Sequence, residues 1–429
     1  MPGKIWVAAL VVIGVIGLYF YIQQVRHGLI ITGLRDYTTW GIYISNFVFF
    51  VAISLVGSLM SAILKLSGAH WRTPLTRISE MIAVAAIIFA SLVIIVDMGR
   101  PDRFLNVVLH ARIQSPITWD VIVISTYLVI SIMLLYLPLL PDLALMRDKL
   151  KDIPKWRQKM YKLMANNWQD TSEQKNILNK AVMVLSIIII PVAFGIHTVT
   201  SWLFATTMRP GWDSTNFGPY FVSGAFMVGA GAVIAAMFVF RKFYKLEHYF
   251  TDGHFDKMGR LLVLLSLVYL YFNINEYFVP AYKMKGLERA HLEELFSGAM
   301  APLFWSVQIG GMIIPILVLL FKNGRKPLPM FLISILVIIG AWFKRFLIVV
   351  PTMTHPYFPI SDQAPEAWRH YSPTLAEWFI TAGTLAGALL IVTFLVRFFP
   401  VVSIVETAED EGLVHTDTVT ELPVNRQNA

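Results

Sequence analysis

A histidine lies inside one of the most apolar stretches of this chain. The stretch from Ile187 to Ala205 reads IIIIPVAFGIHTVTSWLFA and carries His197 in its second half. The imidazole group titrates near pH 6.5, at about the point where a side chain can take up or release protons under physiological conditions. An ionisable group inside a bilayer is costly and marks a functional site by default. His197 is therefore a candidate for proton chemistry, the alternative being a histidine that only forms a hydrogen bond in a packed helix bundle.

Four further polar residues lie near the ends of apolar segments. Asp97 closes one such segment and Asp120 opens the next, while Asn46 lies early and Glu276 lies late in two others. Because successive segments cross a bilayer in opposite directions, these four side chains and His197 are all expected near the outer face. A carboxyl group in apolar surroundings can titrate close to neutral pH, which suits proton transfer beside a histidine.

Each of these residues also has a purely structural interpretation. Asp97 and Asp120 can mark helix ends in the headgroup region, and a carboxylate at a helix N-terminus is favoured by the helix dipole. Asn46 can link two helices through hydrogen bonds. Glu276 can form an ion pair with one of the basic residues at 344–345. The grouping on one side is therefore more informative than any single member.

The composition indicates a polytopic membrane protein. Of the 429 residues, 56% are hydrophobic and 14% are charged, whereas a soluble domain has about 25% charged residues. The mean hydropathy is +0.63. The net charge of +8 does not indicate nucleic-acid binding, because the basic residues cluster in short loops between apolar segments, as the positive-inside rule describes.

The residue types also restrict the cofactors. The chain contains no cysteine, so it cannot hold an iron–sulfur cluster through thiolates, attach a c-type haem or form a disulfide. A membrane haem b needs axial histidines on facing helices, and of the ten histidines only His197 lies well inside an apolar segment. We therefore expect no haem, iron–sulfur cluster or metal site in this chain, and electrons would have to pass to another subunit.

Ten apolar segments are long enough to cross a hydrocarbon core, which needs roughly 20 residues per helix. A weak similarity between segments two to five and segments six to nine predicts two parallel four-helix bundles, with the first and last helices peripheral. The predicted fold class is an all-α polytopic membrane protein. The segments lie at about 5–23, 38–65, 78–98, 117–140, 180–205, 218–241, 258–279, 298–321, 328–350 and 376–399.

The predicted chain has five parts and a defined orientation. Basic residues concentrate in the loops at 141–179 and 241–260. These loops, and with them both termini, are therefore expected in the cytoplasm. The parts are a first peripheral helix with an outer loop (1–37), a first four-helix bundle that carries the site (38–205), a second four-helix bundle (206–350), an outer loop with the last helix (351–400) and a cytoplasmic tail (401–429).

Quinone chemistry fits one histidine, nearby carboxylates and an aromatic-rich outer wall. Reduction of a quinone takes up two protons with two electrons, so the head group needs hydrogen-bond partners and a group that can give or accept protons. The isoprenoid tail needs a cleft that opens to lipid, which a helical bundle provides. The candidate catalytic residues are His197, Asp97 and Asp120, and the candidate quinone-binding residues are Asn46, His197, Asp97 and Glu276.

Four stretches of the chain resemble the NrfD/polysulfide reductase membrane-subunit family. They read TTWGIYISNFVFFVAIS (38–54), RISEMIAVAAIIFASLVIIVDMGRPDRF (77–104), SPITWDVIVISTY (115–127) and HTVTSWLFATTMRPGWDSTNFGPYFVSGA (197–225). The ten-helix form is similar to the quinol-interacting subunits of alternative complex III and to related menaquinone-linked respiratory complexes. Asp213 stands where relatives in alternative complex III often carry a histidine, which favours a sister complex.

The resemblance implies a quinone site near the outer face, at His197, Asp97, Asp120 and Asn46. It also implies a ferredoxin-like iron–sulfur subunit on that face, further redox subunits of the cytochrome c or molybdopterin type, and a second membrane subunit. Menaquinone is favoured over ubiquinone, and the expected location is the inner membrane of a prokaryotic cell, with no nucleic-acid partner.

The sequence thus predicts a quinone-binding membrane subunit of a multi-subunit respiratory oxidoreductase, in which it would act as a non-autonomous part of the complex. It would exchange electrons between the quinone pool and an iron–sulfur partner. Proton translocation stays open, with the inner-half Glu80 and with Glu276 as candidates for a proton path. Two alternatives remain: a secondary transporter, because parallel repeats with buried charges also describe transporters, and a passive membrane anchor without a bound quinone.

Overall fold

The computed structural model describes residues 2–66, 71, 73–150, 152–357, 365 and 370–410. These residues form helices and loops, and no strand occurs among them, as the all-α prediction requires. The α-helices are α1 (Pro2–His27), α2 (Ile42–Leu66), α3 (Thr73–Asp97), α4 (Asn106–Leu109), α5 (Pro116–Tyr136), α6 (Leu140–Lys149), α7 (Lys155–Met164), α8 (Ser172–Ala205), α9 (Phe217–Phe243), α10 (Asp252–Lys283), α11 (Gly286–Phe296), α12 (Ala301–Gln308), α13 (Ile314–Leu320), α14 (Pro327–Met353), α15 (Leu375–Phe398) and α16 (Ile404–Asp410).

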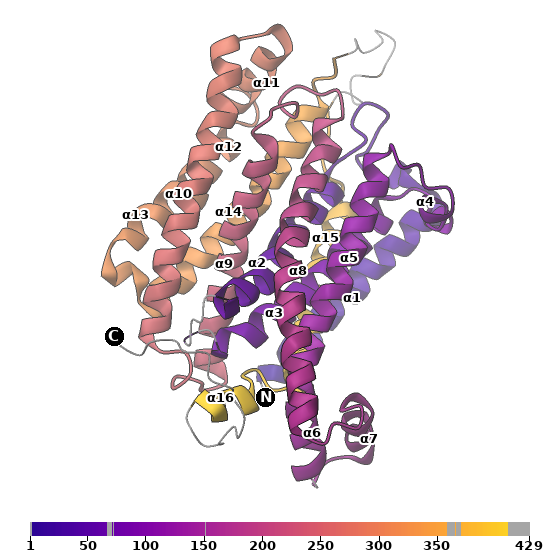
Figure 1. Cartoon of the computed structure of the whole chain (residues 1–429). Helices are drawn as coiled ribbons and strands as arrows, with labels where there is room; N and C mark the ends of the chain where they lie inside the picture. Colours follow the sequence, from indigo (N-terminus) through magenta and orange to yellow (C-terminus); the bar gives the residue numbers. More distant parts are fainter. Residues whose placement is uncertain are drawn as a thin grey trace.

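The prediction of an all-α polytopic membrane protein is confirmed. Within the described part of the chain, nine helical segments are long and apolar enough to cross a membrane. The remaining predicted segment, the second in chain order, is α2, a helix of 25 residues. Its stretch Ile42–Leu55 is a shorter apolar helix found beside those nine. The long helices run side by side, with α11 and α4 at one end and α6, α7 and α16 at the other (Figure 1). We call these the α11 end and the α7 end.

The helices pack in two groups that follow chain order. In the first group α2 contacts α3 and α8, and α5 contacts α3 and α8. In the second group α9 contacts α10 and α14, while α12 and α13 pack against α14 and α10. These contacts support the predicted two-bundle arrangement, although the proposed boundaries of the five parts stay a prediction. The tail at 401–429 is described only as far as α16, and 411–429 lie outside the described residues.

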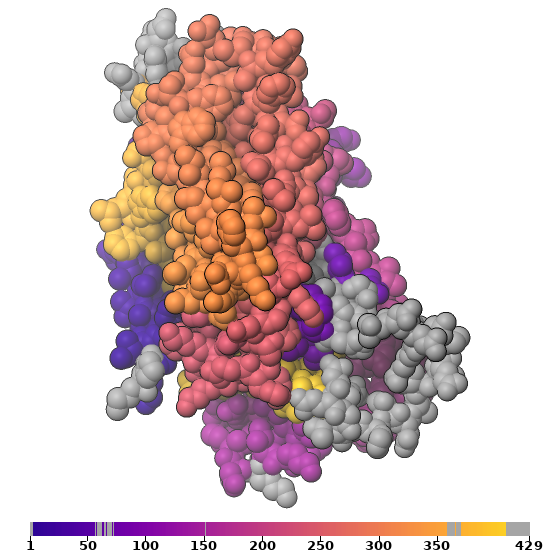
Figure 2. All heavy atoms as spheres, turned by 90° about the vertical axis from the view of Figure 1, so that its left-hand side faces the viewer, coloured from indigo at the N-terminus to yellow at the C-terminus, as the bar shows by residue number. Residues whose placement is uncertain are grey.

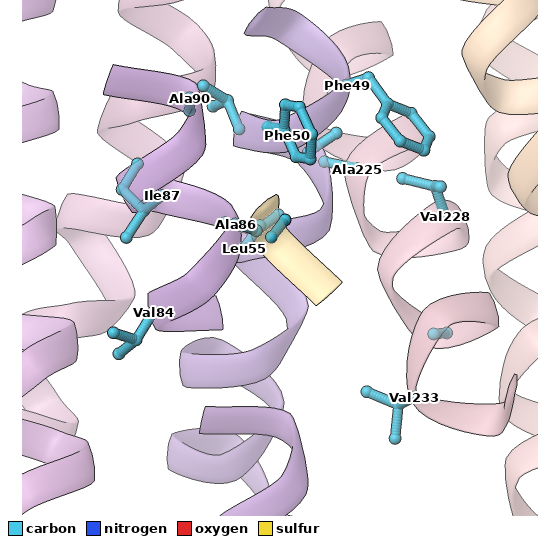
Figure 3. Close-up of a cluster of buried hydrophobic side chains, with 14 of the residues drawn as sticks. Phe49, Phe50, Leu55, Val84, Ala86, Ile87, Ala90, Ala225, Val228 and Val233 are labelled. Carbon is cyan, nitrogen blue, oxygen red and sulfur yellow. The ribbon is translucent and has the colours of Figure 1, made fainter. Parts of the chain in front are cut away.

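An apolar core joins the two groups. Figure 3 shows Phe50 and Leu55 of α2 beside Ala86 of α3, with Ala225 and Val228 of α9 on the other side of the gap between the ribbons. All five side chains are at most 3% exposed. Small residues let the helices approach closely, which is how helices associate in lipid, where burial of apolar surface gives little driving force. α9 is thus the central helix, in contact with both groups.

The eighth predicted span is interrupted. It consists of α12 and α13 joined by a π-helical segment at Ile309–Ile313. Here a Cβ added to Gly311 would come within 2.8 Å of the Cα of Gly340 on α14. Only glycine permits this approach, and π-helical turns are frequent at functional sites. The interruption lies beside the polar residues of the second group described below.

The two peripheral helices pack on each other. α1 contacts α15, and α15 in turn contacts α3 and α2. Gly17 and Gly383 form the closest approach, because a Cβ on Gly17 would lie 2.8 Å from the Cα of Gly383. Figure 2 shows both helices at one edge of the molecule, next to the face formed by α10 to α13. The rest of α1 is largely exposed, which is expected of a helix surrounded by lipid.

A buried ion pair closes the α7 end of the first group. Arg77 of α3 and Asp142 of α6 are 2% and 0% exposed, and their side chains meet at 3.1 Å. Asp142 also accepts hydrogen bonds from the backbone N–H groups of Ile404 and Val405. One carboxylate therefore connects α3, α6 and the start of α16.

Candidate functional site

His197 is buried between helices, and one of its ring nitrogens has no protein partner. The side chain is 2% exposed. Its Nδ1 lies 3.4 Å from the carbonyl oxygen of Ala193, one turn earlier on α8, whereas Nε2 is enclosed without a hydrogen bond. A proton on Nδ1 leaves Nε2 as an acceptor in the neutral ring and as a donor in the protonated ring. The guanidinium group of Arg345 on α14 is near enough to interact electrostatically with the imidazole.

Asp120 of α5 is hydrogen-bonded to a residue that lies one turn after His197 on α8. The hydroxyl of Thr200, three residues after His197 on α8, donates a 2.7 Å hydrogen bond to Asp120 Oδ1 on α5. Asp120 is 4% exposed and Thr200 is 1% exposed. Because residues three apart share one face of a helix, Asp120 and His197 belong to the same buried region.

Asp97 lies at the same end but in a different setting. It ends α3 and is half-buried, and its Oδ1 has no hydrogen-bond partner. Its electrostatic neighbours are Tyr43 of α2 and Glu377 of α15. Glu377 is held in turn by the hydroxyl of Tyr371 at 2.6 Å. Asp97 thus faces α15 and the segment before it, and no hydrogen bond links it to His197.

Asn46 has both ends of its amide engaged by other helices. Its Nδ2 donates to the hydroxyl of Thr381 on α15, and its Oδ1 accepts from the indole N–H of Trp342 on α14, both at 2.8 Å. These contacts favour the interpretation of Asn46 as a link between helices. Its role in quinone binding stays a prediction.

Glu276 belongs to the second group of helices. It is 7% exposed, and its Oε2 accepts hydrogen bonds from Ser214 Oγ at 3.0 Å and from Asn216 Nδ2 at 3.2 Å. Glu276 is part of α10, and its carboxylate is therefore held by two residues of the loop before α9. Glu80, the other predicted proton-path residue, is buried at 3% exposure in α3, near the α7 end.

The second group contains a polar network that the sequence analysis did not identify. The Tyr220 hydroxyl donates to Asn273 Oδ1 at 3.0 Å, and Asn273 Nδ2 donates to Gln308 Oε1 at 2.9 Å. Lys344 Nζ donates to the Tyr277 hydroxyl at 2.5 Å. Asn and Gln side chains form hydrogen bonds between membrane helices, so Asn273 and Gln308 within apolar segments were the available signal.

Two cavities adjoin this network, and neither is lined by His197. The larger encloses about 440 Å³ of space not filled by atoms, part of it open to solvent, between Trp212, Tyr220, Glu276, Tyr277 and His291. The smaller, of about 230 Å³, lies between Tyr269, Asn273, Gln308, Gly311 and Lys344. The predicted residues thus separate into a closed region around His197 and Asp120 and a more open one around Glu276.

Most of the chain matches known proteins. A sequence profile of the polysulphide reductase NrfD family matches residues 31–356. That region runs from the loop before α2 to the end of α14 and holds every predicted site residue. The chain belongs to the NrfD family. The NrfD match includes both groups of helices and leaves out only the peripheral helices and the tail.

This NrfD chain is similar to subunits of reductases and of a menaquinol oxidoreductase. It is 25% identical to a selenate reductase subunit of Mesobacillus selenatarsenatis, over 91% of this chain and 92% of that one. It is 24% identical to the "Hdr-like menaquinol oxidoreductase integral membrane subunit" of Archaeoglobus fulgidus, over 92% and 93%. It is 22% identical to the "Menaquinone reductase, integral membrane subunit" of Nitratidesulfovibrio vulgaris, over 92% and 91%.

Proposed function

We propose that this chain is the quinone-binding membrane subunit of a multi-subunit respiratory oxidoreductase, with the quinone head group at His197. The observation that carries this proposal is the unpartnered Nε2 of a histidine that is 2% exposed. A buried polar atom without a partner costs about 1–3 kcal/mol, and a ligand that supplies the missing hydrogen bond removes that cost. Two relatives named for menaquinone or menaquinol support menaquinone as the ligand.

The region around His197 suits a quinone in its chemistry and in its access to lipid. On α8 the side chains of Phe194 and Trp202 are 42% and 49% exposed, and on α5 that of Ile122 is 59% exposed. These exposed apolar side chains offer a surface along which an isoprenoid tail can lie. The imidazole is 2% exposed, so a head group must displace neighbouring side chains to reach it.

The residues act through hydrogen bonds and proton transfer. A quinone supplies the redox chemistry, taking up two electrons and two protons on reduction. Neutral His197 accepts a hydrogen bond at Nε2 from a quinol hydroxyl and can take its proton, while protonated His197 donates from Nε2 to a quinone carbonyl. Asp120 of α5 receives or supplies the proton and is held by Thr200, which shares a face of α8 with His197. We assign Asp97 to the exit toward the aqueous phase at the α11 end.

The wider setting follows from the same proposal. Electrons pass between the quinone and a ferredoxin-like iron–sulfur subunit docked at the α11 end, close to His197 and Asp97. Further redox subunits and a second membrane subunit complete the complex. The α11 end faces outward across a prokaryotic cell membrane, because the basic α6–α7 region belongs to the cytoplasmic side.

The test is the content of the purified complex. Affinity purification through this chain is expected to co-purify menaquinone, identified by extraction and mass spectrometry, together with a partner that has an iron–sulfur electron paramagnetic resonance signal. A complex with the iron–sulfur signal but no quinone would support a passive anchor. A chain that purifies alone and drives solute uptake into vesicles would support a transporter.

A further inference from the structure

Lys344 is a buried cation in the second group of helices that the quinone proposal does not use. Its side chain is 3% exposed. The ammonium nitrogen lies 4.5 Å from the ring centre of Tyr277, 5.6 Å from that of Phe304 and 5.7 Å from that of Tyr220. Aromatic faces attract a cation, most strongly where water is excluded. The surroundings therefore hold Lys344 at one place.

The nearest carboxylate does not form an ion pair with Lys344. No acidic oxygen of a described residue lies within 4.0 Å of its nitrogen, yet Glu276 interacts with it electrostatically. Ser214 and Asn216 hold the Glu276 carboxylate on the loop side, whereas the Tyr277 hydroxyl holds the ammonium group. A buried charge is rarely kept without a hydrogen-bonded partner of opposite charge. The two groups are thus close but held apart.

The space on either side of this pair has the size of water molecules. The volume that water can occupy is about 30 Å³ in the larger cavity and about 10 Å³ in the smaller one. A buried water needs about 10–15 Å³ by this measure and two to four polar partners. Both cavities therefore have room for water beside the polar groups that line them.

Polar atoms without protein partners border both cavities. In the larger cavity these are Glu288 Oε2 and His291 Nδ1 on α11. In the smaller cavity it is Gln308 Nε2, in a side chain that is 6% exposed. Ordered water is the usual partner of such atoms. Water at these positions would connect the α11 end of the molecule to Glu276 on one side of Lys344 and to Gln308 on the other.

We propose that Glu276 and Lys344 form a proton-exchange pair that takes protons from the α11 end through water in the larger cavity. A proton leaves the Lys344 ammonium group, passes through the Tyr277 hydroxyl or a water molecule, and protonates the Glu276 carboxylate. The pair goes from one positive and one negative charge to two neutral groups, so total charge is conserved. The reverse transfer restores the ions, and Glu276 releases or takes up protons through the cavity. This proposal does not depend on quinone binding.

Figure 2 shows the α10 to α13 face of this group, with α11 at the top.

The first test is water access, which a chain without cysteine makes simple. Thr352, 2% exposed, lines the larger cavity on α14, whereas Val350, 0% exposed, lies two residues earlier on the same helix and does not. In the full chain in vesicles, silver ions added at the α11 side are expected to block a cysteine in Thr352→Cys about tenfold or more faster than one in Val350→Cys, because thiols react as thiolates in contact with water. The rate of blocking is measured as the fraction of thiol that maleimide can still label after each exposure to silver. Equal rates for the two cysteines would show that the cavity contains no water and would overturn the proposal.

The second test follows protonation of Glu276 itself. In vesicles without quinone, the infrared difference spectrum between acid and alkaline pH is expected to contain a protonated-carboxyl band that Glu276→Gln removes. In Lys344→Met, that band is expected to reach half of its full height at about tenfold lower proton concentration than in wild type. The reason is that a nearby cation no longer opposes protonation of Glu276. Lys322→Met, an exposed lysine at the other end of the same group, is the control and leaves the band unchanged.

The spectrum must separate Glu276 from its neighbours. Subtracting the spectrum of Glu276→Gln removes their contributions, so the difference reports one carboxyl group. A Glu276 band with the same titration in wild type and in Lys344→Met would contradict exchange between the two residues, whatever the outcome for quinone binding. The charged and titratable groups that face the pair are Asp213, Tyr220, Tyr269, Tyr277, Glu288, His291 and Arg345.

Discussion

The two groups of helices treat buried polar residues differently. In the first group, His197 has a free ring nitrogen and Asp120 has one hydrogen bond, from Thr200. In the second group, tyrosines, amides, Glu276 and Lys344 form a network beside two cavities. The first arrangement leaves a hydrogen bond for a ligand to complete, whereas the second already connects its groups to one another and to space for water.

Polarity in a membrane helix therefore does not by itself define one kind of site. A single unpartnered atom in a closed setting selects a ligand of matching shape. A connected network can pass protons without binding anything larger than water. The predictions below test whether the two groups divide the work in this way.

The largest effect is expected at His197. His197→Gln keeps a hydrogen-bonding side chain but cannot titrate, so quinone turnover of the purified complex is expected to fall by about 10²–10⁴-fold, the usual contribution of general acid–base catalysis. His197→Phe is expected to weaken quinone binding as well. Ser186→Ala, buried three turns earlier on α8, is the control and keeps wild-type turnover. Wild-type turnover in His197→Gln would identify a packing histidine.

A stability difference is expected at the α7 ends of the two groups. Arg77→Ala leaves Asp142 buried without its cation and is expected to cost about 3–5 kcal/mol. Arg325→Ala breaks the pair with Asp256 in the second group, whose side chains are 13% and 25% exposed, and is expected to cost about 1 kcal/mol. Thermal unfolding of the two variants in detergent measures the difference. Equal losses would show that burial does not set the energy of these pairs.

A smaller effect on turnover is expected at the partner of the histidine. Asp120→Asn removes the group proposed to exchange protons with His197 and is expected to lower quinone turnover by about 10²-fold, the lower end for proton-transfer residues. Thr200→Val keeps the carboxylate but removes its hydrogen bond, and is expected to lower turnover by less than about tenfold. If Thr200→Val were the more damaging change, Asp120 would act only by positioning α8.

The smallest effect is a pH dependence of stability in the second group. Burial, together with the neighbouring His355, lowers the pKa of His291 on α11 to about 3. The unfolded chain therefore binds more protons below pH 6.5, so stability is fully present above about pH 6.5 and is lost as the pH falls. At pH 5 the loss is about 2 kcal/mol. Thermal unfolding at pH 7 and pH 5 is expected to show this loss in wild type and much less of it in His291→Gln.

The sequence was sufficient to predict the long helices but not the shorter elements. Hydrophobic length identified the spans, because the thickness of a bilayer fixes it. The structure extends α8 back to Ser172 and separates α11 from α12. α8 begins with a polar turn, and α11 is a short helix in which apolar and charged residues mix. Neither the start of α8 nor the helix α11 is marked by a run of apolar residues. Packing and helix capping determine these two features instead.

The candidate site was predictable in its types of residue but not in its partners. The burial of His197 follows from its place in an apolar segment. The hydrogen bond between Thr200 and Asp120 depends on the register between α5 and α8, and the cage around Lys344 depends on how α10, α12 and α14 meet. Such contacts between helices far apart in the chain have no local signature.

The contact between α1 and α15 has a consequence for how the chain is made. About 350 residues separate the end of α1 at His27 from the start of α15 at Leu375. At about 5–20 residues per second, a ribosome needs roughly 20–70 s to synthesise that interval. During this time α1 lies in the bilayer with the face around Gly17 unpaired. The meeting of Gly17 with Gly383 is therefore a late event in biogenesis, because it joins α1 to α15 only after the chain between them has been synthesised.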